Sequence, residues 1–432
     1  MIVSDKPRQI AFEVFSDVVR KGDFSNLILP RRLSESGMDS RDKAFTTELV
    51  YGSLRQLGRN DYIASKFSSR DWAEVDPGII DVIRLGAYQL FDMRVPDHAA
   101  VDATVNLARK VIGESKASFV NALMRKLASQ TLEEHLAEVA DDSVASLSIR
   151  YSHPEWIINS YRDSISNVEE LKALLLANNT PVSPTLVAWP GKSTQEDLIK
   201  LGATATKYSK FGARYSGIPS ELALIKERLA GVQDEGSQLL AAIFAEVAQE
   251  KEPWLDLCAG PGGKAALLSH LAKQNLIANE ISPIRAELIK RVVRAGTEVL
   301  VGDGREIDVQ ANAVLADVPC TGLGALRRRP EIRWRRAPSD LPSLTTLQFQ
   351  LASRAIEILP AGGVFAYATC SPHIAETLAQ CASFEKKFPI ESIDVKPFLP
   401  KNLEGAIQDG FMQLWPHRHE TDAMFLALYR KR

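Results

Sequence analysis

Short apolar runs alternate with helical stretches from about residue 231 to the end of the chain, and this alternation constrains the fold most strongly. The runs read "EPWLDLC", "NLIANEI", "TEVLVGD", "NAVLADVP" and "GGVFAYATC". Strands that alternate with helices favour a parallel, doubly wound sheet. Ligands bind such sheets at the carboxyl ends of the strands. We therefore expect residues 231–432 to form a Rossmann-like α/β domain with a site at that edge.

The 432-residue chain is too long for one ordinary core, so two or three domains are expected. In residues 1–130 the apolar residues recur at helical spacing, as in "RQIAFEVFSDVVRKG", and strand-like alternation is scarce. An all-helical domain follows from this pattern. Residues 131–230 have a mixed pattern with Pro and Gly punctuation, which indicates a small α/β linker domain.

The composition limits the partners that the chain can have. A formal charge of −2 and a pI near 6.4 argue against binding of polyanions over the whole surface, so a nucleic-acid site must be concentrated. The start of the chain does not read as a signal peptide, and no stretch of about 18 apolar residues occurs. We expect a cytoplasmic monomer with reduced thiols. The four cysteines form no CxxC pair, so no metal is expected.

The stretch "WLDLCAGPGGKAALLSHLA" reads as a strand, a Gly-rich turn and a helix. Its glycines let backbone N–H groups approach a charged ligand, which the helix dipole also favours. An ATP-type P-loop would need Gly at 258 and Ser or Thr at 265, where Cys258 and Ala265 stand. Glu280 and Asp303 end the next two strands, where acids can bind ribose hydroxyls and an adenine amino group. The pattern favours S-adenosylmethionine as the cofactor.

Two strand ends each deliver a cysteine, in "LADVPCTG" and in "YATCSP". Carbon 5 of a pyrimidine is a poor nucleophile, but a thiolate that adds to carbon 6 makes it reactive toward a methyl donor. This chemistry needs a nucleophilic cysteine, an acid near N3 of the base, and a second base that removes the carbon 5 proton. Cys320, Cys370 and Asp317 supply these residue types, and from the spacing alone either cysteine can be the nucleophile.

Both thiols need positive neighbours, because a free cysteine has a pKa of about 8.5. The loop carrying Lys264 and the basic segment after Cys320 are the expected sources. A single cysteine is more often a small buried hydrophobe, and we interpret Cys258 and Cys381 in that way.

The segment "RRRPEIRWRR" follows the Cys320 loop directly. Arginines bind phosphate in bidentate fashion, and an indole can stack on a base. A run of charges is usually a solvated surface loop, but its place beside Cys320 favours RNA binding. The expected RNA contacts are Arg327, Arg328, Arg329, Arg333, Trp334, Arg335 and Arg336.

With these residues in place, the chain resembles the RNA (cytosine-5) methyltransferases over nearly its whole length. "DLCAGPGGK" is similar to the cofactor loop of that family, "DVPCTGLGALRRRPEIRWR" to its Asp-Pro-Cys motif, and "YATCSPHIAE" to its Thr-Cys-Ser motif. "HAAVDATVNLARK" and "FVNALMRKL" resemble a NusB-like RNA-binding module.

The resemblance implies a role for each residue of the site. Cys370 would be the nucleophile, Cys320 would promote proton removal and product release, and Asp317 would recognise the cytosine. The implied substrate is 16S rRNA, at position 967 in the usual numbering of that RNA, either naked or in an assembly intermediate. The residues assigned to S-adenosylmethionine are Cys258, Ala259, Gly260, Pro261, Gly262, Gly263, Lys264, Glu280, Arg285, Asp303, Gly304 and Asp317.

Two alternatives stay open at this point. The chain departs from the family pattern at residues 183–192 and 421–425, both expected near RNA, so a tRNA cytosine-5 methyltransferase is one alternative. The helical first domain allows a non-catalytic RNA-binding assembly or antitermination factor as the other. Such a factor would need neither cysteine nor Asp317.

Overall fold

The computed structural model describes residues 5–274, 276–403 and 405–432, and over these the chain forms two compact units. The first unit extends to Pro181 and also contains Leu326–Arg336, whereas the second contains Val182–Ala325 and Ala337–Arg432. The chain passes from the first unit to the second after Pro181, and the borders expected at 130/131 and 230/231 stay predictions. The expected start of the first domain, residues 1–4, lies outside the described residues.

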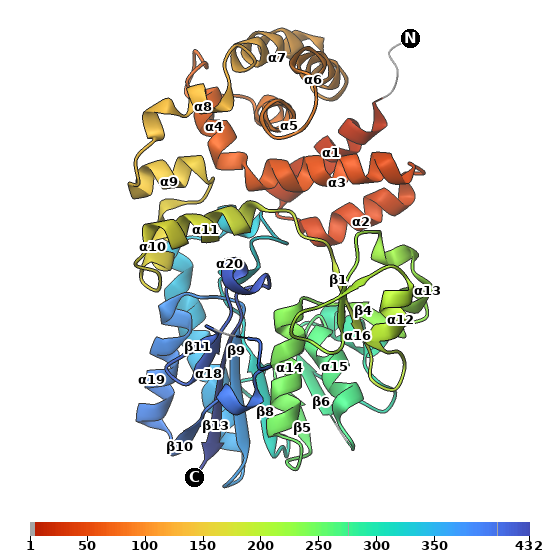
Figure 1. The fold of residues 1–432 in the computed structure, drawn as a ribbon, viewed down its shortest axis with the longest axis vertical. Helices are drawn as coiled ribbons and strands as arrows, with labels where there is room; N and C mark the ends of the chain where they lie inside the picture. The colour runs from red at the N-terminus through yellow and green to blue at the C-terminus, as the bar shows by residue number, and fades with distance from the viewer. Residues whose placement is uncertain (1–4, 275, 404) are drawn as a thin grey trace. The chain divides into compact units, whose positions relative to one another are not determined.

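The first unit is helical, as predicted (Figure 1). The helix α5 illustrates how the sequence sets the start of a helix. It begins at Pro77, and the Asp76 carboxylate caps it by accepting a hydrogen bond from the Gly78 amide at 2.8 Å. The helices are α1 (Lys6–Ser16), the π-helical turn η1 (Asp17–Lys21), α2 (Ser25–Glu35), α3 (Ser40–Arg55), α4 (Leu57–Ser65), α5 (Pro77–Phe91), α6 (Asp97–Val111), α7 (Glu114–Leu127), α8 (Leu132–His135), α9 (Val144–Arg150), α10 (Glu155–Arg162), α11 (Val168–Asn179) and α17 (Ile332–Arg335).

The expected middle domain is divided between the two units. Its helices α8 to α11 belong to the first unit, because side chains such as Leu136 and Val139 are buried in the same core as α5 and α7. Its strands form a small antiparallel sheet in the second unit, in the order β2-β3-β1-β4. The elements are β1 (Thr185–Ala188), α12 (Gln195–Lys200), β2 (Thr204–Ala205), β3 (Gly212–Arg214), α13 (Ala223–Lys226) and β4 (Ala230–Val232).

The second unit contains a large mixed sheet in the order β11-β12-β13-β9-β8-β5-β6-β7, with β10 beside β13. Neighbours from β9 to β7 are parallel, whereas β13 runs antiparallel to β9. The five predicted strands are confirmed. The strands are β5 (Trp254–Asp256), β6 (Leu276–Glu280), β7 (Glu298–Val301), β8 (Ala313–Asp317), β9 (Val364–Thr369), β10 (Ile390–Ile393), β11 (Ile407–Gln408), β12 (Phe411–Gln413) and β13 (Phe425–Lys431).

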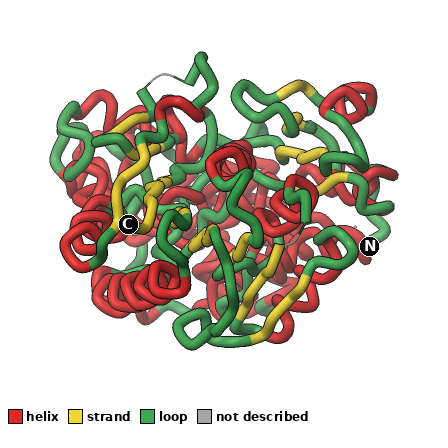
Figure 2. Tube along the Cα trace, turned by 90° about the horizontal axis from the view of Figure 1, so that it is seen from below, coloured by secondary structure: helices red, strands yellow, loops and turns green. Residues whose placement is uncertain are grey.

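Helices cover both faces of this sheet (Figures 1 and 2). Because successive side chains of a strand point to opposite faces, Leu315 of β8 packs with the core under α14 and α15, whereas Val314 packs with the core under α18 and α19. The helices are α14 (Glu235–Val247), α15 (Gly263–Leu271), α16 (Pro283–Val292), α18 (Leu341–Ile358), α19 (Leu378–Lys387) and α20 (Pro416–His419). None of the helices in the described residues is long and apolar enough to cross a membrane.

Candidate active site

The strand register brings the predicted residues to one edge of the large sheet. Asp256, the last residue of β5, pairs with Ala278 of β6 and with Leu315 of β8. Asp317, the last residue of β8, pairs with Ala368 of β9. The segments that follow these strands therefore lie side by side, as expected for parallel strands.

The Gly-rich loop passes tightly against the end of β6. Gly262 has a φ of +112°, which residues other than glycine rarely adopt. A Cβ at this position would lie 2.8 Å from the Val292 side chain. A Cβ at Gly260 would lie 2.0 Å from a carboxylate oxygen of Glu280. Around them, the Ala259 amide donates to the Asn279 carbonyl at 2.9 Å, and Pro261 is exposed. The loop needs glycine because it meets the Glu280 carboxylate at close range.

Glu280 is buried at the end of β6 and is held by two groups. Its carboxylate accepts a hydrogen bond from the Ser282 amide at 2.9 Å and lies 3.4 Å from the Arg285 guanidinium. Arg285 also donates to the carbonyl of Gly260, so it connects the acid to the loop. An oxygen-rich group is thus presented beside the glycines.

Asp303 follows β7 and is paired with Arg305. The carboxylate accepts hydrogen bonds from the Arg305 amide at 2.9 Å and from its guanidinium at 3.0 Å. These bonds hold the pKa of Asp303 below its usual value. Gly304, the next residue, is buried, and a Cβ there would lie 3.0 Å from Leu351.

Asp256 is a functional candidate that our sequence analysis missed. It is buried, and neither carboxylate oxygen has a hydrogen-bond partner. Burial, followed by the charge of Asp317, raises its pKa to about 7. Buried polar groups are normally paired, so an unpaired carboxylate next to a binding loop points to a ligand. The signal was an acid at the end of an apolar strand, directly before the loop.

Lys264 and Asp317 form an ion pair between the loop and β8. The Lys264 ammonium lies 2.6 Å from the Asp317 carboxylate. Burial alone would lower the pKa of Lys264, but the charge of Asp317 and the hydrogen bond to it outweigh burial and raise that pKa. Lys264 is therefore a fixed positive charge at the site.

Cys320 and Cys370 follow β8 and β9, and their sulfur atoms lie 3.4 Å apart. The amide of Gly324 donates to the carbonyl of Cys370 at 2.9 Å, and a Cβ at Gly324 would lie 2.1 Å from the carbonyl oxygen of Ala423. Gly324 thus lets three chain segments meet beside the sulfur atoms, including the segment 421–425 that departs from the family pattern.

The two thiols differ in acidity. A hydrogen bond from Cys320, the largest cause, lowers the pKa of Cys370 together with the charge of Lys264, whereas burial and the charge of Asp317 raise it. The hydrogen bond to Cys370, together with burial, raises the pKa of Cys320 well above its ordinary value. We expected both thiols to be made acidic, but only Cys370 is. The Lys264 loop contributes as expected, whereas the basic segment is not among the causes.

The predicted RNA-binding segment lies largely inside the first unit. Arg333 is 0% exposed, and its guanidinium donates to the carbonyls of Ser152 and Asn178 at 3.0 and 3.2 Å and to the side chain of Asn179 at 2.8 Å. Burial lowers its pKa to about 9. The structure gives no support to the RNA contact expected of Arg333, because its side chain is buried and both terminal nitrogens of its guanidinium are bound near helix ends.

Trp334 also serves the first unit. Its indole N–H donates to the Leu54 carbonyl at 3.0 Å, and a Cβ at Gly58 would lie 2.4 Å from the ring. The indole is thus packed on α4 and not presented for stacking on a base. Arg327 is buried, Arg329 and Arg335 lie over the Phe24 ring, Arg336 is half-buried, and Arg328 is exposed.

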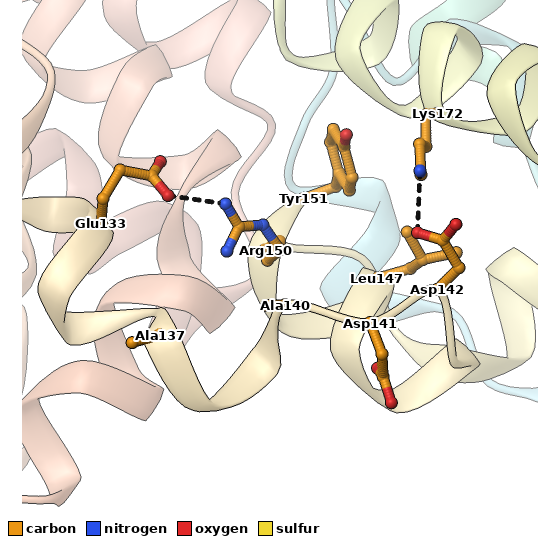
Figure 3. Close-up of a pocket in the computed structure, with 9 residues that line it drawn as sticks. All are labelled: Glu133, Ala137, Ala140, Asp141, Asp142, Leu147, Arg150, Tyr151 and Lys172. Atoms are coloured by element: carbon orange, nitrogen blue, oxygen red, sulfur yellow. Dashed lines mark hydrogen bonds and ion pairs between the residues drawn. The ribbon is translucent and has the colours of Figure 1, made fainter.

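A separate polar cavity of about 330 Å³ lies in the first unit (Figure 3). Its charged groups face one another: Arg150 pairs with Glu133 at 2.7 Å, and Lys172 pairs with Asp142 at 2.8 Å. Its lysine and its arginine are both held in these ion pairs, so we assign it no chemistry. In the described part of the chain no group of three or more His, Cys, Asp or Glu residues is arranged to hold a metal.

Family models match two parts of the chain. The model described as "16S rRNA methyltransferase RsmB/F" matches residues 243–430, and the NusB family model matches residues 5–129. The NusB-like first domain and the methyltransferase sheet that we predicted are thereby confirmed.

Solved structures share the fold. The crystal structure of PH0851 is 19% identical, with a TM-score of 0.82, and the match covers 100% of both chains. The crystal structure of NSun6 from Pyrococcus horikoshii with SFG is 18% identical, with a TM-score of 0.56, over 64% of this chain and 98% of that one.

Curated relatives match over nearly the full length. The Mycobacterium tuberculosis protein named "Putative methyltransferase MT1451" is 40% identical, over 99% of this chain and 97% of its own. Ribosomal RNA small subunit methyltransferase B of Enterobacter sp. is 30% identical, over 94% of this chain and 97% of its own. With the two cysteines and the Gly-rich loop at one sheet edge, the chain belongs to the RsmB/F family of 16S rRNA methyltransferases and is an enzyme of methyl transfer.

Proposed function

We propose that the protein transfers a methyl group from S-adenosylmethionine to carbon 5 of a cytosine in 16S rRNA, through a covalent bond between Cys370 and carbon 6 of the base. The observation that carries this proposal is the pair of sulfur atoms 3.4 Å apart, of which Cys370 is the more acidic. A pure RNA-binding factor needs no such pair.

The residues at the sheet edge suit S-adenosylmethionine, which when bound supplies an electrophilic methyl group. Glu280 would bind the ribose hydroxyls, and Asp303 would bind the adenine amino group. The unpaired carboxylate of Asp256 suits the cationic end of the cofactor. The glycine at 260 leaves room where a Cβ would collide with Glu280. The remaining loop residues would contact the cofactor mainly through their backbone.

The chain's own groups can carry each step on the base. The Cys370 thiolate adds to carbon 6, which makes carbon 5 nucleophilic, while the Asp317 carboxyl, in its protonated form, donates a hydrogen bond to N3. Lys264 holds Asp317 in place before the base arrives and stabilises the thiolate, since it lies 2.6 Å from the Asp317 carboxylate and lowers the pKa of Cys370. After methylation Cys320 promotes removal of the carbon 5 proton. The bond between carbon 6 and sulfur then breaks, and Cys370 leaves as a thiolate.

The family supports 16S rRNA as the substrate, and we propose position 967 in the usual numbering, in the cytoplasm and with the protein as a monomer. A base must leave its stack to reach the cysteines, at a cost of a few kcal/mol, which favours an exposed loop nucleotide. Arg328 is the member of the basic segment that is best exposed for RNA contact.

The cysteines separate the steps experimentally. Cys370→Ala should be inactive and bind RNA only non-covalently, because no bond to carbon 6 can form. Cys320→Ala should accumulate a protein–RNA adduct that survives denaturing electrophoresis in the presence of cofactor, and the double variant should not. An adduct with Cys370→Ala would reverse the roles. Near-normal turnover without an adduct in both folded variants would rule out the covalent mechanism.

The target is tested in cells. Bisulfite sequencing of rRNA and tRNA from a deletion strain should show loss of one small-subunit signal. Loss of tRNA signals alone would instead make the protein a tRNA methyltransferase, and unchanged signals in both RNAs would favour a non-catalytic factor.

A further inference from the structure

Glu376 is a buried acid directly behind the two cysteines. It ends the short helical turn Ile374–Glu376 that follows Cys370, and its side chain is 0% exposed. Its carboxylate accepts hydrogen bonds from the amide of Thr321 at 2.8 Å, from the Thr321 hydroxyl, and from the side chain of Gln348 at 3.0 Å. All of these donors are neutral groups. The negative charge of Glu376 is therefore stabilised by hydrogen bonds and is not neutralised by a positive side chain among the described residues.

These hydrogen bonds hold the backbone on both sides of Cys320. Gln348, whose amide donates to Glu376, also donates to the Pro319 carbonyl at 2.9 Å. Glu376 itself accepts from the amide of Thr321. The residue before Cys320 and the residue after it are thus fixed by one buried pair of side chains.

The same network extends to the other cysteine. The Thr321 hydroxyl lies 3.1 Å from the hydroxyl of Ser371, the residue after Cys370. The Tyr367 hydroxyl, from β9, donates to the main-chain carbonyl of Glu376 at 2.9 Å. Fully satisfied polar networks of this kind fix one arrangement of the loops. The spacing of the two sulfur atoms depends on this arrangement.

Charge also distinguishes the two sulfur atoms. When one of two thiols in contact loses its proton, the proton that remains is shared, and the surroundings decide which sulfur keeps it. The charge of Glu376 acts on Cys320 and raises its pKa, after the larger effects of Cys370 and burial. On Cys370 the charge of Lys264 lowers the pKa and the charges of Asp317 and Asp422 raise it, so the lowered pKa of Cys370 comes first from its hydrogen bond with Cys320. These charges act in a poorly solvated region, where they interact more strongly than in water.

We propose that Glu376 is a positioning residue that holds Cys320 beside Cys370 and keeps the proton on Cys320, so that Cys370 carries the negative charge. This inference rests on the proposed function for its purpose, since a proton kept on Cys320 leaves Cys370 as the thiolate that attacks carbon 6. The state of the two thiols can nevertheless be measured without RNA or cofactor.

The wild-type protein gives the first test. The full chain is treated with iodoacetamide between pH 6 and 10, and peptide mass spectrometry reads alkylation of Cys320 and Cys370 separately; both side chains are partly exposed. Cys370 should react at least tenfold faster than Cys320 near neutral pH. Equal rates, or faster reaction of Cys320, would overturn the proposal without any variant.

Variants of Glu376 give the second test. Glu376→Gln keeps the size of the side chain but removes its charge, so the ratio of Cys370 to Cys320 alkylation should fall about tenfold and the pH profile of Cys320 should move to lower pH. Glu376→Asp keeps the charge and should restore part of the ratio. Glu385→Gln is the matched control, because Glu385 lies on α19 and accepts from Tyr429 at 3.1 Å instead.

The outcomes separate this inference from the proposed function. A folded Glu376→Gln variant with an unchanged alkylation ratio would overturn the inference, whatever the RNA experiments show. A changed ratio in a protein that never forms an RNA adduct would support the inference and refute the covalent mechanism. If Glu376→Gln does not fold, the alkylation ratio of the wild-type protein and the pH profile of Glu376→Asp still test the inference.

Discussion

The two halves of the sheet edge are built differently. In the cofactor half, at the ends of β6 and β7, Glu280 and Asp303 are held by Arg285 and Arg305, whose side chains are 49% and 45% exposed. In the cysteine half, after β8 and β9, the supporting residue Glu376 is fully buried and is bound by neutral donors. One half is tied by ion pairs to half-exposed arginines and the other by an interior network.

The difference matches what each half must do. Exposed ion pairs contribute little, typically about 0 to 1 kcal/mol. The arginine of each pair here is half-exposed, so an arriving ligand can reach and replace it. A reaction that needs two sulfur atoms at fixed spacing gains instead from groups locked by packing and buried hydrogen bonds. We expect the cofactor half to rearrange on binding and the cysteine half to keep its geometry.

Asp256→Asn should have the largest effect, on stability. The folded protein binds a proton at Asp256 up to pH about 7, whereas the unfolded chain releases it near pH 4. Stability should therefore fall as the pH rises through this window, by about 4 kcal/mol at most. The Asn variant should lack this loss, so its advantage over wild type grows from pH 4 to pH 8.

Denaturant unfolding at several pH values, without cofactor, measures this difference. If the difference in unfolding free energy between variant and wild type is the same from pH 4 to pH 8, Asp256 is already ionised and paired in the folded protein. The buried polar groups of the cofactor half would then be hydrogen-bonded as completely as those of the cysteine half.

Lys264→Met should lower single-turnover methyl transfer about 100-fold, the range found on removal of one preorganised charge. The variant loses the charge that lowers the pKa of Cys370 and leaves Asp317 without its partner. Part of the activity should return at higher pH, since the thiol then ionises by itself. Lys290→Met, at an exposed pair on α16, is the control. A loss that no pH change recovers would assign Lys264 to binding alone.

Glu280→Ala should weaken binding of S-adenosylmethionine at least tenfold. The variant removes charge-assisted hydrogen bonds worth roughly 1.5 to 3 kcal/mol each. Calorimetry measures the affinity, with Glu287→Ala on the exposed side of α16 as control. Unchanged affinity in a folded variant would take Glu280 out of the cofactor site, and the proposed exchange of its arginine would lose its basis.

Arg328→Ala should have the smallest effect. Loss of one phosphate contact should flatten the salt dependence of RNA binding by about 0.7 per contact with a single strand. Arg333→Met should leave this slope unchanged and lower the stability of the protein instead, because Arg333 is buried. Binding titrations at several salt concentrations compare the two. An altered salt dependence of RNA binding for Arg333→Met would mean that Arg333 contacts RNA.

The sequence alone predicted those parts of the molecule that depend on local sequence patterns. The five strands of the parallel part follow from apolar runs, and the meeting of Cys320 and Cys370 follows from parallel strands that end at one edge. The burial of Arg333 could not be read in this way, because its partners are carbonyls at helix ends far away in sequence. Glu376 was missed for the same reason, since its donors are Thr321 and Gln348.

The placement of Leu326–Arg336 in the first unit affects how the protein is made. A ribosome releases the helices up to α11 long before it adds α17, so the carbonyls of Leu54, Ser152 and Asn178 have no such donors until strands β5 to β8 of the large sheet have been synthesised. The helical unit is consequently not encoded by one continuous piece of the chain. A gene fragment that stops at residue 181 encodes it without one of its own helices, and exchange of this module between genes would have to carry a second, internal piece of sequence.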